Sequence, residues 1–254
     1  MVDIAIRIAR GQRVGAARDR RVVDVGPLTG LLHDSPSMFL SYAVARQPGS
    51  DVTQGEVEAA LPRLRETFGA EGKPLRFELV DEASPGLVAG LLACGARRTG
   101  TFPLLATSPD QVRCPDLPAG TRVVSVLDAE QQAQAHRVAR AAFEEDLPEL
   151  AVPTDPAAGG TVLVVHRDEP VAVASWTAVA EGVTEIVGVA TVPEYRRRGF
   201  GRLATAHAVR AAAGGGATLT WLTPGDTGAH RLYRGLGFRH VGTAAHLVDG
   251  SAEI

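Results

Sequence analysis

The chain has 254 residues, of which 45% are apolar, and a formal net charge of −3, which is typical of a globular protein with room for one large or two small domains. It contains no uncharged apolar run long enough to span a bilayer, and the acidic Asp3 precedes no apolar stretch of signal-peptide length. We therefore expect a cytoplasmic protein with no membrane contact, no metal site and no nucleic-acid surface.

The first 106 residues give few local signals, but one of them is an internal repeat. A helix is predicted over Glu56–Phe68 and a strand over Arg76–Val80. The segment Pro85–Ala106 aligns with Thr227–Val248 at a constant offset. The identical pairs are Gly86/Gly228, Gly95/Gly237, Arg97/Arg239, Gly100/Gly242, Thr101/Thr243 and Leu105/Leu247. We interpret residues 1–106 as a degenerate, shortened copy of the fold that follows, the alternative being chance similarity between two helix–glycine–strand turns.

A proline-punctuated segment, residues 107–119, reads as a linker to a second domain at residues 120–254. In this second domain Asp128 is predicted to cap a helix that runs to about Phe143, with Gln131 as its capping partner. The other predicted elements are strands at Thr121–Leu127, Thr161–His166, Val171–Ala180, Thr184–Val192, Ala217–Leu222 and Phe238–Val248, and helices at Gly199–Ala213 and Thr227–Gly235. Short connections indicate an antiparallel meander, and the order β-α-β-β-β-α-β-α-β predicts an α/β domain with a mixed, mostly antiparallel sheet flanked by helices.

The segment with the clearest chemical signal lies between Glu185 and Arg202. A strand ends at Pro193, and a helix is predicted to begin after Arg196. A helix N-terminus presents free N–H groups and partial positive charge, and Gly199 and Gly201 allow an anion to approach the backbone closely. The neighbouring arginines add fixed positive charge, so the segment suits a pyrophosphate.

This segment resembles the (Arg/Gln)-x-x-Gly-x-(Gly/Ala) signature of the GNAT superfamily of acetyltransferases, including the preceding strand and the x-x-Pro-x-Tyr flank. The resemblance implies that acetyl-CoA is the co-substrate, that the signature holds its pyrophosphate, and that the backbone of the preceding strand binds the pantetheine arm and polarises the thioester carbonyl. The cofactor-binding residues implied in this way are Val189, Ala190, Thr191, Arg196, Arg197, Arg198, Gly199, Phe200, Gly201 and Arg202.

A dinucleotide-binding loop is the rival interpretation of the same glycines. It requires a third glycine after the first strand of a parallel βαβ unit. Here Ala204 stands in that place, the loop follows a meander, and the lysine–serine/threonine pair of a P-loop is missing. The sequence therefore favours coenzyme A binding.

Two residues are candidates for catalysis. The segment Ala229–Phe238 resembles the GNAT segment whose tyrosine protonates the leaving thiolate, which implies this role for Tyr233; packing in the core is the alternative. Glu185 resembles the strand glutamate that serves as base in some members of the family; the alternative is an exposed strand residue. The asparagine of the family aligns with Asp226, which leaves that cofactor contact in doubt.

The N-terminal copy lacks these parts, since Leu91 corresponds to Tyr233 and Thr53–Val57 corresponds to the cofactor segment. We expect an N-acetyltransferase that acts by direct attack of a small-molecule or peptide amine within a ternary complex. A catalytically silent acyl-CoA-binding module is the alternative, and a homodimer is left open. Carboxylates at Glu144, Glu145 and Asp146 favour a cationic amine as acceptor, unless they form only a solvated loop.

Overall fold

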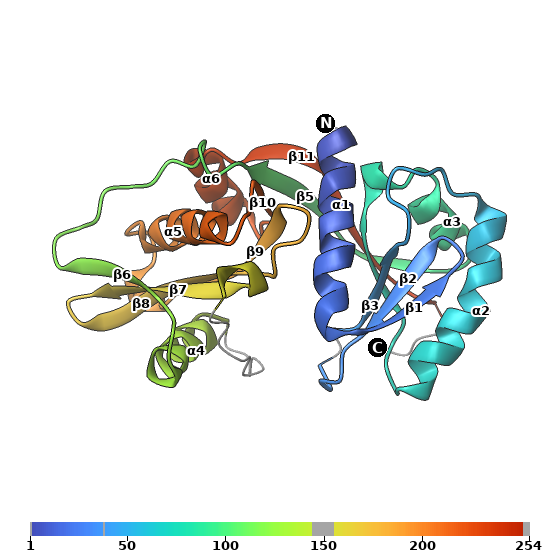
Figure 1. The fold of residues 1–254 in the computed structure, drawn as a ribbon, viewed down its shortest axis with the longest axis horizontal. Coiled ribbons are helices and arrows are strands. Elements are labelled where there is room, and N and C mark those ends of the chain that lie inside the picture. Colours follow the sequence, from blue (N-terminus) through green and yellow to red (C-terminus); the bar gives the residue numbers. More distant parts are fainter. Residues whose placement is uncertain (1, 38, 144–154, 251–254) are drawn as a thin grey trace. The chain divides into compact units, whose positions relative to one another are not determined.

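The computed structural model describes residues 2–37, 39–143 and 155–250 (Figure 1). The chain forms two compact units: unit 1 comprises Met1–Leu104 together with His240–Ile254, and unit 2 comprises Leu105–Arg239. Among the described residues, no helix is both long enough and apolar enough to cross a membrane.

Unit 2 is built on a mixed sheet in the order β6-β7-β8-β9-β10-β5. Its strands are β6 (Thr121–Ser125), β7 (Gly160–His166), β8 (Glu169–Trp176), β9 (Val183–Thr191), β10 (Leu219–Leu222) and the last residues of β5 (Arg97–Thr107). All neighbours are antiparallel except β9 and β10, which are parallel. The predicted meander and fold class are therefore confirmed.

Helices cover both faces of this sheet. Helices α5 (Phe200–Gly214) and α6 (Thr227–Leu236) lie on one face and α4 (Ala129–Phe143) on the other, as Figure 1 shows. The predicted cap of α4 is present, because the Gln131 N–H donates to Asp128 Oδ1 at 2.8 Å. Alanines on the buried side of α5 allow it to approach the strands closely, and the helix gives way to glycines after Gly214.

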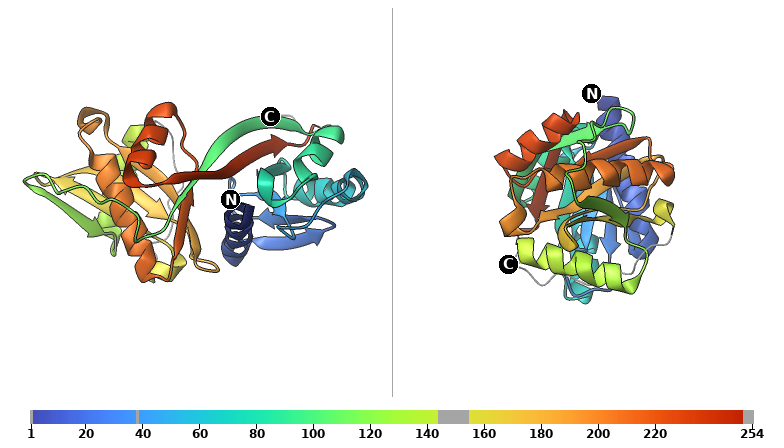
Figure 2. Two further views of the ribbon diagram at one scale, coloured as in Figure 1. Left: turned by 90° about the horizontal axis from the view of Figure 1, so that it is seen from above. Right: turned by 90° about the vertical axis from the view of Figure 1, so that its left-hand side faces the viewer.

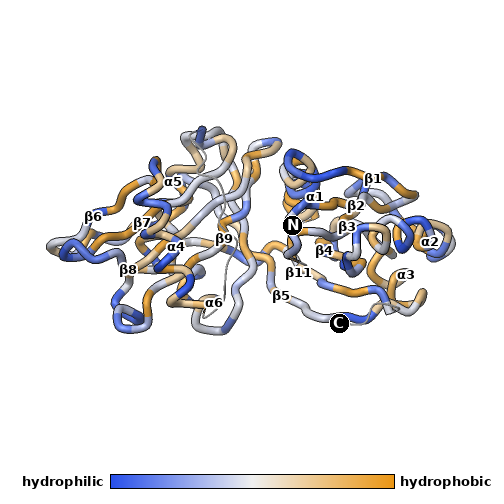
Figure 3. The backbone as a smooth tube through the Cα atoms, turned by 90° about the horizontal axis from the view of Figure 1, so that it is seen from below, coloured by the Kyte–Doolittle hydropathy of each residue, from blue (hydrophilic) through white to orange (hydrophobic). Residues whose placement is uncertain are grey.

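Unit 1 contains a sheet in the order β1-β2-β3-β4-β11-β5. Its elements are α1 (Val2–Ala16), β1 (Arg21–Val25), β2 (Leu28–Leu32), β3 (Tyr42–Ala45), α2 (Gln54–Ala70), β4 (Arg76–Val80), α3 (Leu87–Ala93), β5 (Arg97–Thr107) and β11 (Arg239–Val248). Its main core gathers Leu64, Phe68, Phe77 and Leu91 between the sheet and helices α2 and α3. Figure 3 shows the apolar stretches along the strands of each unit and the hydrophilic ones largely in turns and on helix surfaces.

The C-terminal strand is the element that departs from the domain division expected from the sequence, which placed all of residues 120–254 together. Strand β11 pairs antiparallel with β4 from Ala244↔Val80 to Val248↔Arg76, so it belongs to unit 1 (Figure 2). In turn Leu105–Thr107 of β5 pair with β10 in unit 2. Strand pairing between distant segments leaves no local mark in a sequence, which explains the difference.

Side-chain contacts fix β11 in unit 1. The backbone N–H and hydroxyl of Thr243 donate to Glu82 at 2.7 and 2.9 Å. The Arg65 guanidinium makes a bidentate contact with Asp249, whose side chain is 2% exposed. These anchors explain why the last strand of the chain completes the first unit.

The two units share one order of elements from β1 in unit 1 and from β7 in unit 2, where β6 and α4 come first. From these points, three antiparallel strands are followed by a helix, a strand parallel to the third, a further helix and a last strand. In each, the sheet is extended by the last strand of the other half of the repeat, β11 beside β4 and β5 beside β10. This correspondence supports the interpretation of the N-terminal half as a second copy, which we infer to be degenerate.

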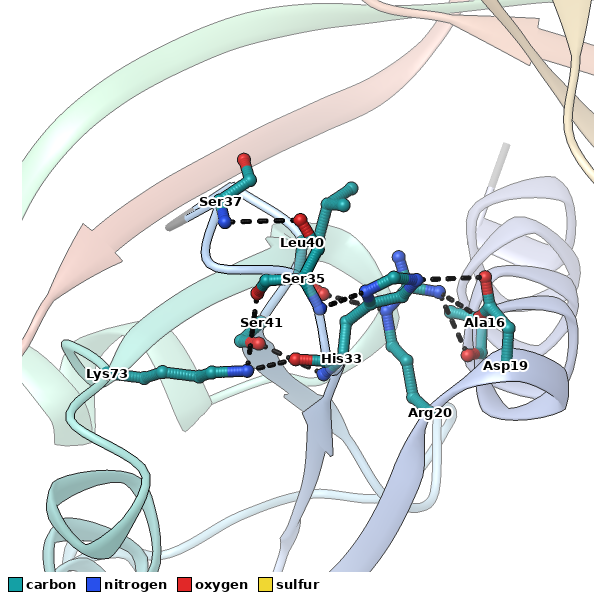
Figure 4. Close-up of polar contacts among 9 residues, drawn as sticks. All are labelled: Ala16, Asp19, Arg20, His33, Ser35, Ser37, Leu40, Ser41 and Lys73. Atoms are coloured by element: carbon teal, nitrogen blue, oxygen red, sulfur yellow. Dashed lines mark hydrogen bonds and ion pairs between the residues drawn. The ribbon is translucent and has the colours of Figure 1, made fainter. Parts of the chain in front are cut away.

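A polar network in unit 1 holds the connection between β2 and β3 (Figure 4). The single lysine of the chain, Lys73, donates to the carbonyl oxygens of His33 and Ser35. His33 Nδ1 accepts from the Ser35 N–H at 2.9 Å, and its Nε2 lies 3.7 Å from Asp19 Oδ2. Arg20 donates to the Leu40 carbonyl at 2.8 Å. Both ring nitrogens of His33 thus have partners, and we interpret the network as one that stabilises the connection between β2 and β3.

Candidate functional site

The turn between β9 and α5 carries the cofactor segment predicted from the sequence. After β9 ends at Thr191, the chain makes a short helical turn at Pro193–Tyr195, and Arg197 and Gly199 adopt φ values of 62° and 90°. Helix α5 then begins at Phe200, with Gly199 as an N-cap that supplies no side-chain hydrogen bond. Within the described part of the chain, no N-cap side chain therefore bonds the first-turn N–H groups of α5, which are placed to bind an external acceptor.

The two glycines of the signature have different structural reasons. Gly199 needs a left-handed backbone, which a residue with a side chain adopts only at a cost in free energy. A Cβ on Gly201 would lie 3.2 Å from Thr191 Oγ1. The absence of a side chain at position 201 thus lets the start of α5 lie directly against the end of β9.

The arginines of this turn differ in their contacts. The guanidinium of Arg196 donates to the carbonyl oxygens of Thr191, at 3.2 Å, and of Ala142, at 3.0 Å. It therefore ties the turn to the last residues of α4, and its part in cofactor binding stays a prediction. Arg198 lies over the ring of Tyr195 at 5.1 Å, while Arg197 is exposed.

Strand β9 is irregular beside Val189–Thr191, the residues that the sequence resemblance implies bind the pantetheine arm. Its register with β8 shifts by one residue between Val187 and Ala190, and Gly188 has a φ of 60°, so β9 contains a bulge. The pairing of β9 with β10 ends at Glu185 and Trp221, whereas β9 continues to Thr191. The peptide groups of Val189, Ala190 and Thr191 therefore lie beyond the paired part of the β9–β10 edge.

Tyr233 lies near the end of α6 and is 7% exposed. Its ring packs against Phe238 at a centroid distance of 5.8 Å. Burial, followed by the nearby carboxylate of Asp226, raises the pKa of Tyr233 from 10.0 to about 12. The phenol therefore keeps its proton throughout the physiological pH range.

Asp226 has a structural role that explains why an acid stands in this position. It is the N-cap of α6, and its side chain accepts a hydrogen bond from the Ala229 N–H at 2.7 Å. An aspartate is among the preferred residues at an N-cap.

Glu185 is the last residue of β9 that pairs with β10. Its backbone is held by Thr177, which bonds both its N–H and its carbonyl oxygen. The neighbouring Ile186 packs into the core beneath α5, so alternation along the strand directs Glu185 toward the face that α4 covers. The two candidate catalytic residues thus come from different elements and from different sides of the sheet.

In the described part of unit 1, the start of the corresponding helix α2 is closed by its own side chains. Helix α2 begins with a capping box, in which Thr53 and Glu56 satisfy each other's backbone N–H groups. The loop before α2 is also bonded to the start of α3, because the Val52 N–H donates to Pro85 O at 2.9 Å. A Cβ on Gly86 would lie 2.2 Å from Val52 O, so the two segments are in direct contact.

Sequence reasoning missed the bulge in β9 and the hydrogen bonds of Arg196. The isolated Gly188 in a strand pattern was an available signal for the bulge. The bonds from Arg196 could not be foreseen, since they depend on where α4 ends. The acidic segment at Glu144, Glu145 and Asp146 lies outside the described residues.

Comparisons with known proteins identify the family of this chain. The model of the acetyltransferase (GNAT) family matches residues 125–238. A GCN5-related N-acetyltransferase from Kribbella flavida is 47% identical, with 98% of this chain and 96% of that chain covered and a TM-score of 0.90. A search of curated proteins found no match.

Two more distant structures show the same fold. A putative GNAT acetyltransferase from Novosphingobium aromaticivorans is 22% identical, covering 97% of this chain and 96% of that one, with a TM-score of 0.56. A tandem GNAT protein from the clavulanic acid biosynthesis pathway is 14% identical, covering 91% and 80%, with a TM-score of 0.60. The matches at low identity show a shared mixed α/β fold, and the 47% identity over nearly the whole length shows that this chain belongs to the GNAT acetyltransferase family.

Proposed function

We propose that the protein is an acetyl-CoA-dependent N-acetyltransferase whose active site lies in unit 2, at the β9–α5 turn and the adjoining end of β9. The observation that carries the proposal is the uncapped start of α5, placed against a strand that runs past its pairing with β10. Membership of the GNAT family supports acetyl transfer in general.

The residues of the turn fit a coenzyme A pyrophosphate. The first-turn N–H groups of α5 and the exposed Arg197 offer hydrogen bonds and positive charge, and Gly199 and Gly201 place no side chain in the way. Acetyl-CoA would supply the activated acetyl thioester. The matching helix of unit 1 closes its own N-terminus and adds the Glu56 carboxylate, so we expect one cofactor site per chain.

The first requirement of the reaction is stabilisation of the negative charge that develops in the transition state. As the amine attacks the carbonyl carbon and the carbon–sulfur bond breaks, charge builds first on the carbonyl oxygen and then on sulfur. We assign the stabilisation of the oxygen to peptide N–H groups of Val189–Thr191, which lie beyond the β9–β10 pairing.

We assign the stabilisation of the leaving sulfur to the hydroxyl group of Tyr233. Complete proton transfer from a phenol of pKa about 12 to a thiolate, whose acid has a pKa of about 8.5, is uphill by about 5 kcal/mol. Tyr233 therefore stabilises the thiolate mainly as a hydrogen-bond donor that cannot lose its proton to solvent at neutral pH.

The acceptor amine must be deprotonated before it attacks, since an alkyl ammonium has a pKa of about 10. Glu185 is our candidate base, acting directly or through water, because it stands at the last paired position before β9 and β10 separate. The acceptor we propose is a primary amine of a small molecule or peptide, with a cationic one favoured by the acidic segment after α4.

Release of free coenzyme A in the presence of a panel of amines tests the proposal. We expect acetyl-CoA binding together with amine-dependent thiol release by the full-length protein. Binding without release for any amine, polyamine or peptide amine would favour a silent acyl-CoA-binding module instead. A protein that binds no acetyl-CoA would refute both.

A further inference from the structure

A hollow of about 340 Å³ lies at the C-terminal end of α6, away from the β9–α5 turn in sequence. It is lined by Gln111, Arg113, Arg234, Gly237, Phe238 and Arg239. All of these residues belong to unit 2, and none of them is part of the proposed cofactor segment. Three of the six lining residues are arginines, which makes the hollow strongly basic.

Backbone contacts hold the residues at the base of the hollow in place. Gly237 ends α6 with a φ of 104°, and a Cβ there would lie 2.7 Å from the carbonyl oxygen of Gln111. The Arg113 N–H donates to Leu236 O at 2.9 Å. Gln111 and Arg113, which lie within the predicted linker, are thus held against the end of α6, and packed backbone sets the positions from which the arginine side chains extend.

The three arginines carry charge that no residue in the described part of the chain pairs with. Arg113, Arg234 and Arg239 are exposed, and within residues 2–37, 39–143 and 155–250 none of their guanidinium groups has an ion pair or a hydrogen bond. The carbonyl groups at the C-terminal end of α6 compensate little of this positive charge, because two of them already accept hydrogen bonds. The Gly237 N–H donates to Arg234 O, and the Phe238 N–H donates to Tyr233 O. Like charges gathered in this way repel one another, and an anion placed among them relieves the repulsion.

We propose that this hollow is a second ligand site, which binds a small oxyanion of at least two charges, such as a phosphate ester or a polycarboxylate. Its volume is that of a small-molecule site. Arginine forks bind phosphate and carboxylate oxygens in pairs, and Gln111 adds an uncharged donor. Phe238 lines the hollow and packs on Tyr233, so a bound anion contacts the segment that carries the candidate acid.

Calorimetric titration of the full-length protein with sodium pyrophosphate tests the site. The protein carries Arg197→Gln and Arg198→Gln in all samples, so that the cofactor turn is weakened as a competing anion site. We expect binding of one pyrophosphate per chain, which weakens as sodium chloride is added. Arg113→Gln and Arg239→Gln should each weaken it at least tenfold, and Arg113→Lys, which keeps the charge and loses the fork, by less.

Arg210→Gln removes an exposed arginine of α5 and is the matched control, expected to leave the affinity unchanged. A parallel titration with citrate distinguishes a general polyanion site, which binds both probes, from a phosphate site, which binds pyrophosphate alone. The inference is refuted if pyrophosphate fails to bind at millimolar concentration, or if binding survives Arg113→Gln and Arg239→Gln together. Neither result bears on the acetyl-CoA site.

Discussion

Replacing Tyr233 by phenylalanine tests the assigned chemistry with the smallest change to the structure. The ring is 7% exposed and packs on Phe238, and phenylalanine keeps both the ring and this contact. Only the hydroxyl is lost, so the fold and the affinity for acetyl-CoA should stay close to those of the wild type.

The size of the effect follows from the environment of the phenol. General acids contribute about 10²–10⁴-fold to rate. Because the raised pKa makes full proton transfer to sulfur unfavourable, we expect the lower end, a fall in kcat of about 100-fold. A pKa of about 12 also means that loss of the Tyr233 proton does not limit the rate below about pH 10, so both proteins should show the same alkaline limb.

The assay is single-turnover release of coenzyme A, which reports the chemical step rather than product release. Tyr42→Phe is the matched control, since Tyr42 is a tyrosine of similar burial in unit 1, at 8% exposed. An unchanged rate in Tyr233→Phe would show that the tyrosine is only a packing residue. A large rise in Kd for acetyl-CoA would show instead that the hydroxyl serves binding.

Two further predictions concern stability and are measured by urea unfolding. Burial raises the pKa of Glu78 from 4.5 to about 7, so the folded state binds this proton more tightly and stability falls as pH rises through that range. Glu78→Gln should therefore raise the free energy of unfolding near pH 8 by up to about 3 kcal/mol and change it little near pH 4. An equal effect at both pH values would contradict this. A similar effect from the control Glu58→Gln, which replaces an exposed glutamate, would also contradict it. Arg65→Ala leaves the buried Asp249 carboxylate without its bidentate partner and should lower the free energy of unfolding by about 3 kcal/mol. The control Arg63→Ala on the same helix should lower it by less than about 0.5 kcal/mol. Equal losses would show that the pair does not anchor β11.

Elements with strong local signals could be predicted from the sequence. Asp128 with Gln131 marked the start of α4, and Gly199 with Gly201 marked the start of α5. The predicted order of elements in residues 120–254 is the observed order, because each is bounded by a cap, a proline or a glycine. The motif also pointed to the correct family.

Features that depend on contacts between distant segments could not be predicted. The partner of β11 is β4, and Arg196 is bonded to the Ala142 carbonyl, which only the folded chain brings near. The first three strands of unit 1 have no motif of their own. They became recognisable only when their order and pairing could be compared with β7, β8 and β9.

Calorimetric titration with acetyl-CoA tests the central claim most directly, when it compares two aspartates placed at matching helix positions. Gly201→Asp puts a carboxylate in the first turn of α5, whereas Gly55→Asp puts one in the first turn of α2, in open space. The account predicts one acetyl-CoA per chain, an affinity reduced at least tenfold by Gly201→Asp, and no change with Gly55→Asp. Two molecules bound per chain, or an affinity that Gly201→Asp leaves unchanged while the fold is intact, would contradict it.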